Sequence, residues 1–306
     1  MSIDLEAGDP PQDPEELEAF GAANPEIAPD TTVGAVELTV ADLERSLGYY
    51  ASAIGLDTLE KGSGRASLGA GAGELLALVE ETGARPSRGH TGLYHFALRV
   101  PARPALARWL AHAARDRVSL VGLSDHGVSE AIYLSDPDGH GIEIYADRPR
   151  ALWEGRVFEQ LTTIPLDVES LFGELEDPAT EPFDALPGGT VMGHVHLSVA
   201  SIPDTVAFYR DVLGFGLMAE LHQAAFLSAG GYHHHIGANT WESSGATPPP
   251  AGTAALRQAT IVLPDSAERD LVIARIVAAG GAIEDRAAGP TTQDPSANTL
   301  LLALAV

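Results

Sequence analysis

The chain has 306 residues, of which 45% are hydrophobic, so it is long enough for about two domains and has ample apolar material for folded cores. Its 43 acidic and 18 basic residues give a formal net charge of −25, which makes nucleic acid and anionic membranes poor candidate partners. Cysteine is absent, which excludes disulfides, thiolate metal sites and cysteine nucleophiles. Any metal must therefore be held by nitrogen and oxygen.

The first 32 residues are acidic and rich in proline, and we expect residues 1–32 to form an extended arm. A signal peptide would begin with basic residues followed by an apolar run, and this segment has neither. No run of about 18 apolar residues is present that could span a membrane. These features predict a cytoplasmic protein.

An internal repeat follows the arm. Residues 33–43, VGAVELTVADL, match residues 192–202, MGHVHLSVASI, at an offset of 192 − 33 = 159. The match continues through Tyr50 and Tyr209, so a strand and the helix after it recur in register. We infer a duplication of about half the chain.

Each half contains a second, fainter copy of the same unit, which predicts an α+β fold built from βαβββ-like modules. The four modules are expected at residues 33–82, 92–149, 192–243 and 256–306. They would make up a first half, 33–149, and a second half, 191–306. Between them, residues 150–190 are expected to be a linker that contains a short amphipathic helix.

Three predicted strands carry a polar residue on the face away from their apolar side chains. Successive side chains of a strand alternate, so His95 lies opposite Phe96 and Leu98. The same parity places His194 and Glu143 opposite the apolar residues of their own strands. If these faces converge, they form a 2-His-1-carboxylate set, the usual ligand pattern of non-haem Fe(II) oxygenases. Mn(II), Zn(II) and Ni(II) also accept such donors.

The modules resemble the vicinal oxygen chelate superfamily of barrel-like domains, which includes extradiol ring-cleaving dioxygenases, glyoxalase I and bleomycin-resistance proteins. Over residues 33–306 the chain is most similar to catechol 2,3-dioxygenase-like proteins. The resemblance implies metal ligands on the first strand of a module, where His95 and His194 stand, and after Asp-Pro-x-Gly, where Glu143 stands.

Residues 125–143, DHGVSEAIYLSDPDGHGIE, resemble the extradiol segment that carries a catalytic histidine, a tyrosine and the glutamate ligand in that order. The match implies that His126 is the acid/base histidine and that Tyr133 hydrogen-bonds the metal-bound hydroxyl. The run YHHHI resembles the strand that supplies another catalytic histidine, best matched by His234. His140 is expected to be an exposed turn residue.

The chain departs from the family pattern in which all ligands come from the two C-terminal modules. Module four has Gln258 and Leu301 at the expected ligand positions, and module one has Ala35. Only modules two and three keep ligands, so a metal site requires these two modules to pair across the halves. With ordinary pairing, each half would be incomplete, which would indicate a binding or scaffold protein.

The resemblance implies an extradiol dioxygenase of aromatic catabolism, with Fe(II), an aromatic diol and dioxygen as its cofactor and substrates. The alternatives are a glyoxalase-type metal-dependent isomerase or lyase and a noncatalytic small-molecule-binding protein. His126 and Tyr133 favour the oxygenase, because a glyoxalase has no need of that pair. Four modules can complete two barrels in one monomer, so a homo-oligomer is compatible with the site but not required.

Overall fold

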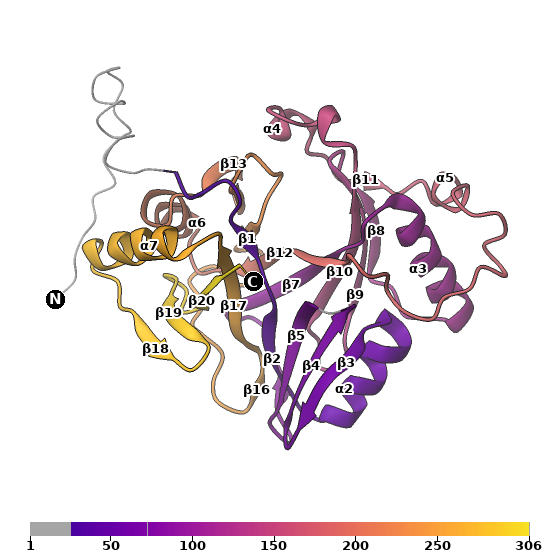
Figure 1. The fold of residues 1–306 in the computed structure, drawn as a ribbon, viewed down its shortest axis with the longest axis horizontal. Coiled ribbons are helices and arrows are strands. Elements are labelled where there is room, and N and C mark those ends of the chain that lie inside the picture. The colour runs from indigo at the N-terminus through magenta and orange to yellow at the C-terminus, as the bar shows by residue number, and fades with distance from the viewer. Residues whose placement is uncertain (1–25, 72, 306) are drawn as a thin grey trace.

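The computed structural model describes residues 26–71 and 73–305 (Figure 1). Most of the predicted acidic arm, residues 1–25, lies outside this part of the chain. Within the described residues, the strands form two nine-stranded sheets and one two-stranded ribbon, accompanied by helices. The architecture is therefore the mixed α+β fold that the repeat predicts.

The first sheet combines the strands of modules two and three with one strand of the connection between them. In order across the sheet its strands are β11 (Ile164–Pro165), β8 (Gly122–Asp125), β9 (Ser129–Ser135), β10 (Gly141–Asp147), β7 (Gly92–Arg99), β12 (Val191–Ser198), β15 (Ile236–Asn239), β14 (Ala224–Ser228) and β13 (Gly216–Leu221). Strands β7 and β12 pair antiparallel where the two modules meet. The predicted pairing of modules two and three is confirmed.

The second sheet combines modules one and four in the same manner. Its strands are β18 (Glu284–Arg286), β19 (Gly289–Gln293), β20 (Thr299–Leu304), β17 (Leu256–Leu263), β2 (Val36–Val40), β5 (Gly73–Glu80), β4 (Arg65–Ala70) and β3 (Asp57–Gly62), with β1 (Thr32–Val33) beside β17. Strands β2 and β17 pair antiparallel where these modules meet. The separate ribbon consists of β6 (Arg85–Pro86) and β16 (Thr253–Ala254).

Each module contributes one helical segment, and three short helices lie in the connection. The segments are α2 (Leu43–Tyr49) with its π-helical continuation η1 (Tyr50–Ile54), α3 (Arg103–Asp116), α6 (Ile202–Val206) with η3 (Ala207–Val212), and α7 (Ser266–Ala278); the connection holds η2 (Arg150–Leu152), α4 (Val157–Gln160) and α5 (Val168–Phe172). The repeat extends to the caps, because Asp42 and Ser201 each accept a hydrogen bond from the backbone three residues later. No helix in the described ranges has the length and apolarity needed to cross a membrane.

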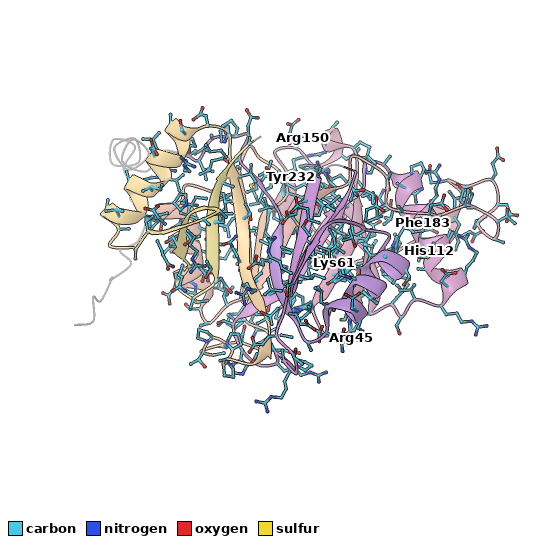
Figure 2. The ribbon with its side chains drawn as sticks, turned by 60° about the horizontal axis from the view of Figure 1, so that its bottom comes forward. Arg45, Lys61, His112, Arg150, Phe183 and Tyr232 are labelled. Atoms are coloured by element: carbon cyan, nitrogen blue, oxygen red, sulfur yellow. The ribbon has the colours of Figure 1, made fainter. Side chains whose placement is uncertain are left out.

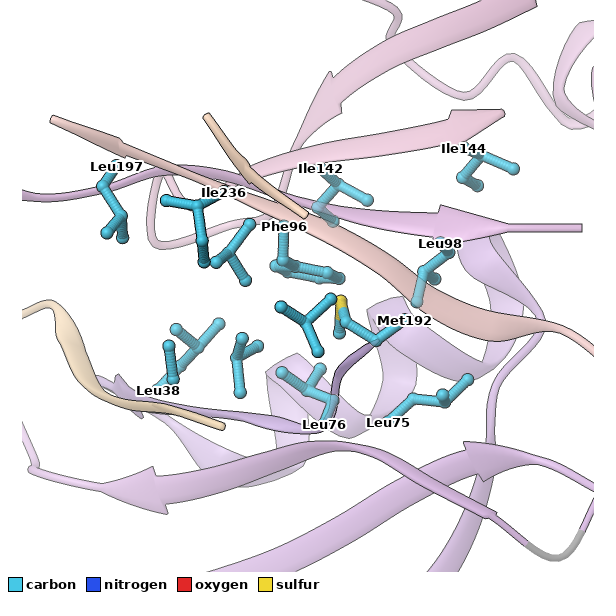
Figure 3. Close-up of a cluster of buried hydrophobic side chains, with 14 of the residues drawn as sticks. Leu38, Leu75, Leu76, Phe96, Leu98, Ile142, Ile144, Met192, Leu197 and Ile236 are labelled. Atoms are coloured by element: carbon cyan, nitrogen blue, oxygen red, sulfur yellow. The ribbon is translucent and has the colours of Figure 1, made fainter. Parts of the chain in front are cut away.

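The apolar faces of the two sheets contribute to one hydrophobic core (Figure 3). Phe96 of β7 and Ile142 of β10 are fully buried in it, together with Leu38 of β2 and Leu76 of β5. The strand alternation thus has the predicted consequence: apolar side chains of the first sheet enter this core, and the opposite face is left to polar side chains.

The connection between the halves packs along the first sheet. Strand β11 pairs with β8 at the sheet edge. Further along, the Phe183 ring stacks on His112 of α3, with ring centroids 4.3 Å apart and an interplanar angle of 17° (Figure 2). The β11–β8 pairing, together with a hydrogen bond from the Thr162 N–H to the His126 carbonyl oxygen at 3.2 Å, holds the segment before β11 next to the β8–β9 turn, where His126 stands.

The turn between β9 and β10 contains one departure from expectation. His140 was predicted to be exposed, but only 5% of its surface is accessible, and its Nε2 lies 2.9 Å from the Thr39 carbonyl oxygen. The Tyr50 hydroxyl donates to Asp136 of the same turn at 2.9 Å. The prediction of exposure was wrong because module one covers this turn.

Candidate metal centre

Three polar side chains from neighbouring strands meet on the polar face of the first sheet: His95 of β7, Glu143 of β10 and His194 of β12. Glu143 Oε2 lies 3.0 Å from His95 Nε2 and 3.1 Å from His194 Nε2, and the two Nε2 atoms are 3.3 Å apart. Their exposed fractions are 6%, 2% and 2% for His95, Glu143 and His194. Across the described ranges, these three form the one cluster of histidine and carboxylate side chains compact enough to share a metal ion.

The sheet registers explain this convergence. Ala97 of β7 is the neighbour of both Glu143 in β10 and His194 in β12. Its methyl group leaves the space between the flanking strands open on this face. His95 lies two residues away on the same face, so the longer side chains reach its imidazole ring.

Burial and mutual contact set the protonation states of the cluster. Burial would raise the pKa of Glu143, but the adjacent His194 and His95 hold it well below its ordinary value. Burial lowers the pKa of His194 to about 4, although Glu143 acts in the opposite direction. At neutral pH the site therefore contains a carboxylate and a neutral His194, the states that metal ligation requires.

The donor set fits a divalent metal. If each imidazole donates its Nε2–H to Glu143, the two N–H groups also face each other across the 3.3 Å separation of His95 and His194. A cation held by all three side chains removes this conflict, because it uses their lone pairs. Two ligand atoms that each lie about 2.1 Å from the same ion are about 3.0 to 3.4 Å apart when the ligand–metal–ligand angle lies between the octahedral and the tetrahedral value. The observed spacings fit this range without selecting a particular metal.

His126 and Tyr133 form a hydrogen-bonded pair beside the cluster. His126 Nε2 lies 2.8 Å from the Tyr133 hydroxyl, and His126 Nδ1 lies 2.9 Å from the carbonyl oxygen of Thr162 in the connection. Because a carbonyl only accepts, the proton of neutral His126 is on Nδ1, and Nε2 accepts from Tyr133. Tyr133 is also the cross-strand neighbour of Glu143. Burial, reinforced by Glu143, keeps the pKa of Tyr133 well above its ordinary value, so it remains a phenol.

His234 lies on the other side of the cluster, in the turn before β15. Its ring centroid is 4.1 Å from that of His194, and its Nδ1 is 2.9 Å from Nδ1 of His233. Burial, with the neighbouring histidines adding to the effect, lowers the pKa of His234 well below its ordinary value. His234 is therefore neutral at physiological pH.

One cavity of about 1130 Å³ joins these groups. It is lined by all six predicted site residues: His95, His126, Tyr133, Glu143, His194 and His234. An apolar cavity of about 150 Å³ is sufficient for benzene, so this one has room for a substituted aromatic ring. The structure thus gathers every candidate residue around a single space.

His196 is a further cavity residue, to which the sequence analysis assigns no role. It lines the cavity as the cross-strand neighbour of His95. Its Nε2 is buried without a hydrogen-bond partner among the described residues. Its position two residues after His194, on the same strand face, was the available signal. This nitrogen can form a hydrogen bond with a bound molecule.

The fold and this site define a class of protein. The model of the Glyoxalase/Bleomycin resistance protein/Dioxygenase superfamily matches residues 32–144 and 191–293. The chain belongs to this superfamily.

Comparison with individual proteins narrows the assignment. A catechol-2,3-dioxygenase from Bacillus subtilis (strain 168) is 43% identical over 278 residues, which cover 88% of this chain and 95% of the relative. Because this relative is an enzyme and the match covers most of both chains, the chain is an enzyme of the superfamily.

Two solved structures share the fold. A putative dioxygenase from Bacillus subtilis has a TM-score of 0.61 and 16% identity, covering 89% of this chain and 85% of that one. Glyoxalase I from Zea mays has a TM-score of 0.55 and 16% identity, covering 89% of this chain and 92% of that one. At such identities the two structures indicate the fold alone.

Proposed function

We propose that the protein is an extradiol ring-cleaving dioxygenase that acts on a catechol-type aromatic diol. The observation that carries the proposal is that one cavity is lined both by the cluster of His95, Glu143 and His194 and by the pair His126–Tyr133. The name and 43% identity of the Bacillus subtilis relative support the same activity.

His95, Glu143 and His194 are proposed to hold Fe(II), because two imidazoles and one carboxylate leave coordination positions for substrate and dioxygen. Bound iron supplies Lewis acidity toward the two diol oxygens and a site at which dioxygen is activated. Mn(II) suits the same donors and the same reaction class. Zn(II) or Ni(II) would instead accompany the isomerase or lyase alternative.

His126 and Tyr133 are proposed to accept one proton from the diol and later return it. Since Tyr133 donates its proton to His126 Nε2, the free lone pairs of its oxygen can accept a hydrogen bond from a substrate hydroxyl. His126 Nε2 can take the Tyr133 proton as the substrate hydroxyl delivers its own to the phenol oxygen. The proton then rests on His126 Nε2, from which it can return to the product.

The surrounding protein orients these groups. Thr162 fixes the His126 ring through Nδ1, and the buried strands keep the three ligand candidates within contact distance. A preorganised cavity of this kind holds the diol in one orientation and limits the access of water.

The decisive experiment is anaerobic loading with Fe(II), followed by catechol and then dioxygen. We expect consumption of dioxygen and a yellow ring-opened product that contains both of its oxygen atoms. Bound iron with no such product from any of a series of substituted catechols would contradict the proposal. Isomerisation of a thiol–aldehyde adduct by the Zn(II)- or Ni(II)-loaded protein would then favour the glyoxalase-type alternative, to which the fold shared with glyoxalase I also points.

A further inference from the structure

A chain of hydrogen bonds runs from the cavity into the protein through His234. His234 Nδ1 lies 2.9 Å from His233 Nδ1, and His233 Nε2 lies 2.9 Å from Asp147 Oδ1. His233 is fully buried, and the ring of Trp153 meets its ring at 72° with centroids 5.5 Å apart. His233 therefore has both ring nitrogens engaged and links a cavity residue to a carboxylate.

The carboxylate of Asp147 is held at the end of β10. The Tyr232 hydroxyl (Figure 2) donates to it at 3.0 Å, and Arg99 Nη1 donates at 3.1 Å. Burial would raise the pKa of Asp147, but its contacts with His233 and Arg99 hold it below the ordinary value. Asp147 is thus an ionised group that can only accept hydrogen bonds.

The direction of each hydrogen bond in the chain follows from this acceptor. His233 Nε2 must carry the proton that points to Asp147. In neutral His233 the other nitrogen, Nδ1, then has only a lone pair and accepts from His234. Arg99 already supplies a positive charge to Asp147, so a neutral His233 leaves no isolated carboxylate charge. His234 must accordingly have its proton on Nδ1 and a lone pair on Nε2.

The lone pair on His234 Nε2 is available to a molecule bound in the cavity. His234 lines the cavity wall with its ring against that of His194, at a centroid distance of 4.1 Å. Its Nδ1 is the nitrogen directed to His233, away from the ligand cluster. Nε2 is the ring nitrogen left to meet a bound molecule.

We propose that Asp147 and His233 are positioning residues that hold His234 in the Nδ1–H tautomer and present its Nε2 lone pair to the substrate. The catalytic consequence rests on the proposed dioxygenase function. In this tautomer His234 Nε2 accepts a hydrogen bond from one diol hydroxyl and thereby orients the diol. The Nδ1–H of His234 stays directed at His233. In the opposite tautomer, Nε2 would be a donor and could not accept this hydrogen bond.

The tautomer can be measured directly in the unmodified sequence. Uniformly ¹⁵N-labelled protein loaded with Zn(II), which is diamagnetic, gives separate imidazole correlations for protonated and bare ring nitrogens. A difference spectrum with His234→Gln assigns the signals of His234. We expect a protonated Nδ1 and a bare Nε2 at neutral pH. A protonated Nε2 in the wild-type protein would overturn the proposal, whatever any variant does.

A variant tests the role of Asp147 in setting the tautomer. In Asp147→Asn the amide oxygen is expected to face Arg99, which only donates, so the amide N–H₂ faces His233 Nε2 and donates to it. This reverses the direction of both hydrogen bonds in the chain. We expect the His234 proton to move to Nε2 and kcat for ring cleavage to fall about 10²-fold or more, with little change in KM. An unchanged tautomer signal in folded Asp147→Asn would contradict the proposal.

Tyr232→Phe is the matched control. It removes a neighbouring donor to Asp147 but leaves both histidines and the carboxylate, so the wild-type tautomer signal should persist. If the wild-type signal is as expected and no diol is cleaved, the positioning role stands and the proposed dioxygenase function fails. The two outcomes are therefore distinguishable.

Discussion

His95 and His194 are 99 residues apart in the chain, yet their Nε2 atoms lie 3.3 Å apart across the antiparallel pair β7–β12. The two residues belong to different halves of the duplicated sequence. Each half thus supplies an incomplete set of ligand candidates, and the pairing of modules two and three completes it.

Removing the carboxylate from the cluster should remove the metal. In Glu143→Gln the two imidazoles remain, but the site loses its anionic donor and gains an amide N–H₂ group in a buried space. We expect iron affinity to fall by at least about 10- to 100-fold, the effect already seen for changes outside the ligand shell of other sites. Metal content after dialysis, measured by mass spectrometry, tests this. Glu37→Gln is the control, because Glu37 occupies the position in module one that His196 occupies in module three, and its metal content should equal wild type.

The pair His126–Tyr133 should affect turnover more than metal binding. His126→Gln removes the nitrogen that accepts the Tyr133 proton, and we expect kcat for ring cleavage to fall about 10²- to 10⁴-fold with iron content unchanged. Initial rates of product formation, normalised to bound iron, provide the measurement. His222→Gln changes an exposed histidine and should leave the rate intact. Loss of iron from His126→Gln would assign His126 to metal binding instead.

Gly193 of β12 should contribute to stability because no side chain fits at its position. A Cβ at this position would collide with the hydroxyl of Tyr145, a fully buried ring that hydrogen-bonds Tyr232. We expect Gly193→Ala to lower the free energy of unfolding by about 1–3 kcal/mol, as overpacking does. Denaturant titration measures the change. Gly48→Ala, in the interior of α2 with open space at the Cβ position, should raise stability by up to about 1 kcal/mol. Equal effects of the two substitutions would contradict this account.

Asp125 should make stability depend on pH. Although burial acts to raise it, hydrogen bonds from Arg148 and the Gly127 backbone hold the pKa of Asp125 below its ordinary value. The unfolded chain therefore binds a proton at Asp125 more tightly than the folded protein does. The stabilisation that the ionised Asp125 carboxylate provides is complete above about pH 4 and is lost as pH falls through the folded pKa. We expect Asp125→Asn to cost about 1 kcal/mol at pH 7. The difference in the free energy of unfolding between Asp125→Asn and wild type should shrink below about pH 4. Denaturant titrations at several pH values measure it, and a difference that does not change with pH would contradict an ionic origin.

Much of the site geometry could be predicted because it depends on period-two alternation. Parity alone assigned His95, Glu143 and His194 to the polar face of their strands. The family resemblance marks Ala35 and Gln258 as ligand positions that have lost their ligands, and this indicated which modules pair. These are properties of the residue pattern, and they survive small changes in strand bounds.

Other parts of the site depend on contacts that the pattern does not encode. The burial of His140 requires module one to cover the turn, and the position of His126 requires Thr162 from the connection. The chain from His234 to Asp147 depends on how the turn before β15 meets the end of β10. No local periodicity specifies such distant neighbours, so these features emerged only from the folded chain.

Modules two and three lie in the chain between modules one and four, so during synthesis the first sheet can form before the second sheet. Glu37 of β2 and Arg257 of β17 are joined by a hydrogen bond although 220 residues separate them. At about 5–20 residues per second, a ribosome would need roughly 10 to 40 s to make the intervening chain. During that interval modules two and three can assemble, while β2 has an unpaired edge that invites association with other chains. The arrangement that completes the candidate metal centre thus leaves the second sheet as the last part to be built and the most exposed to association with other chains.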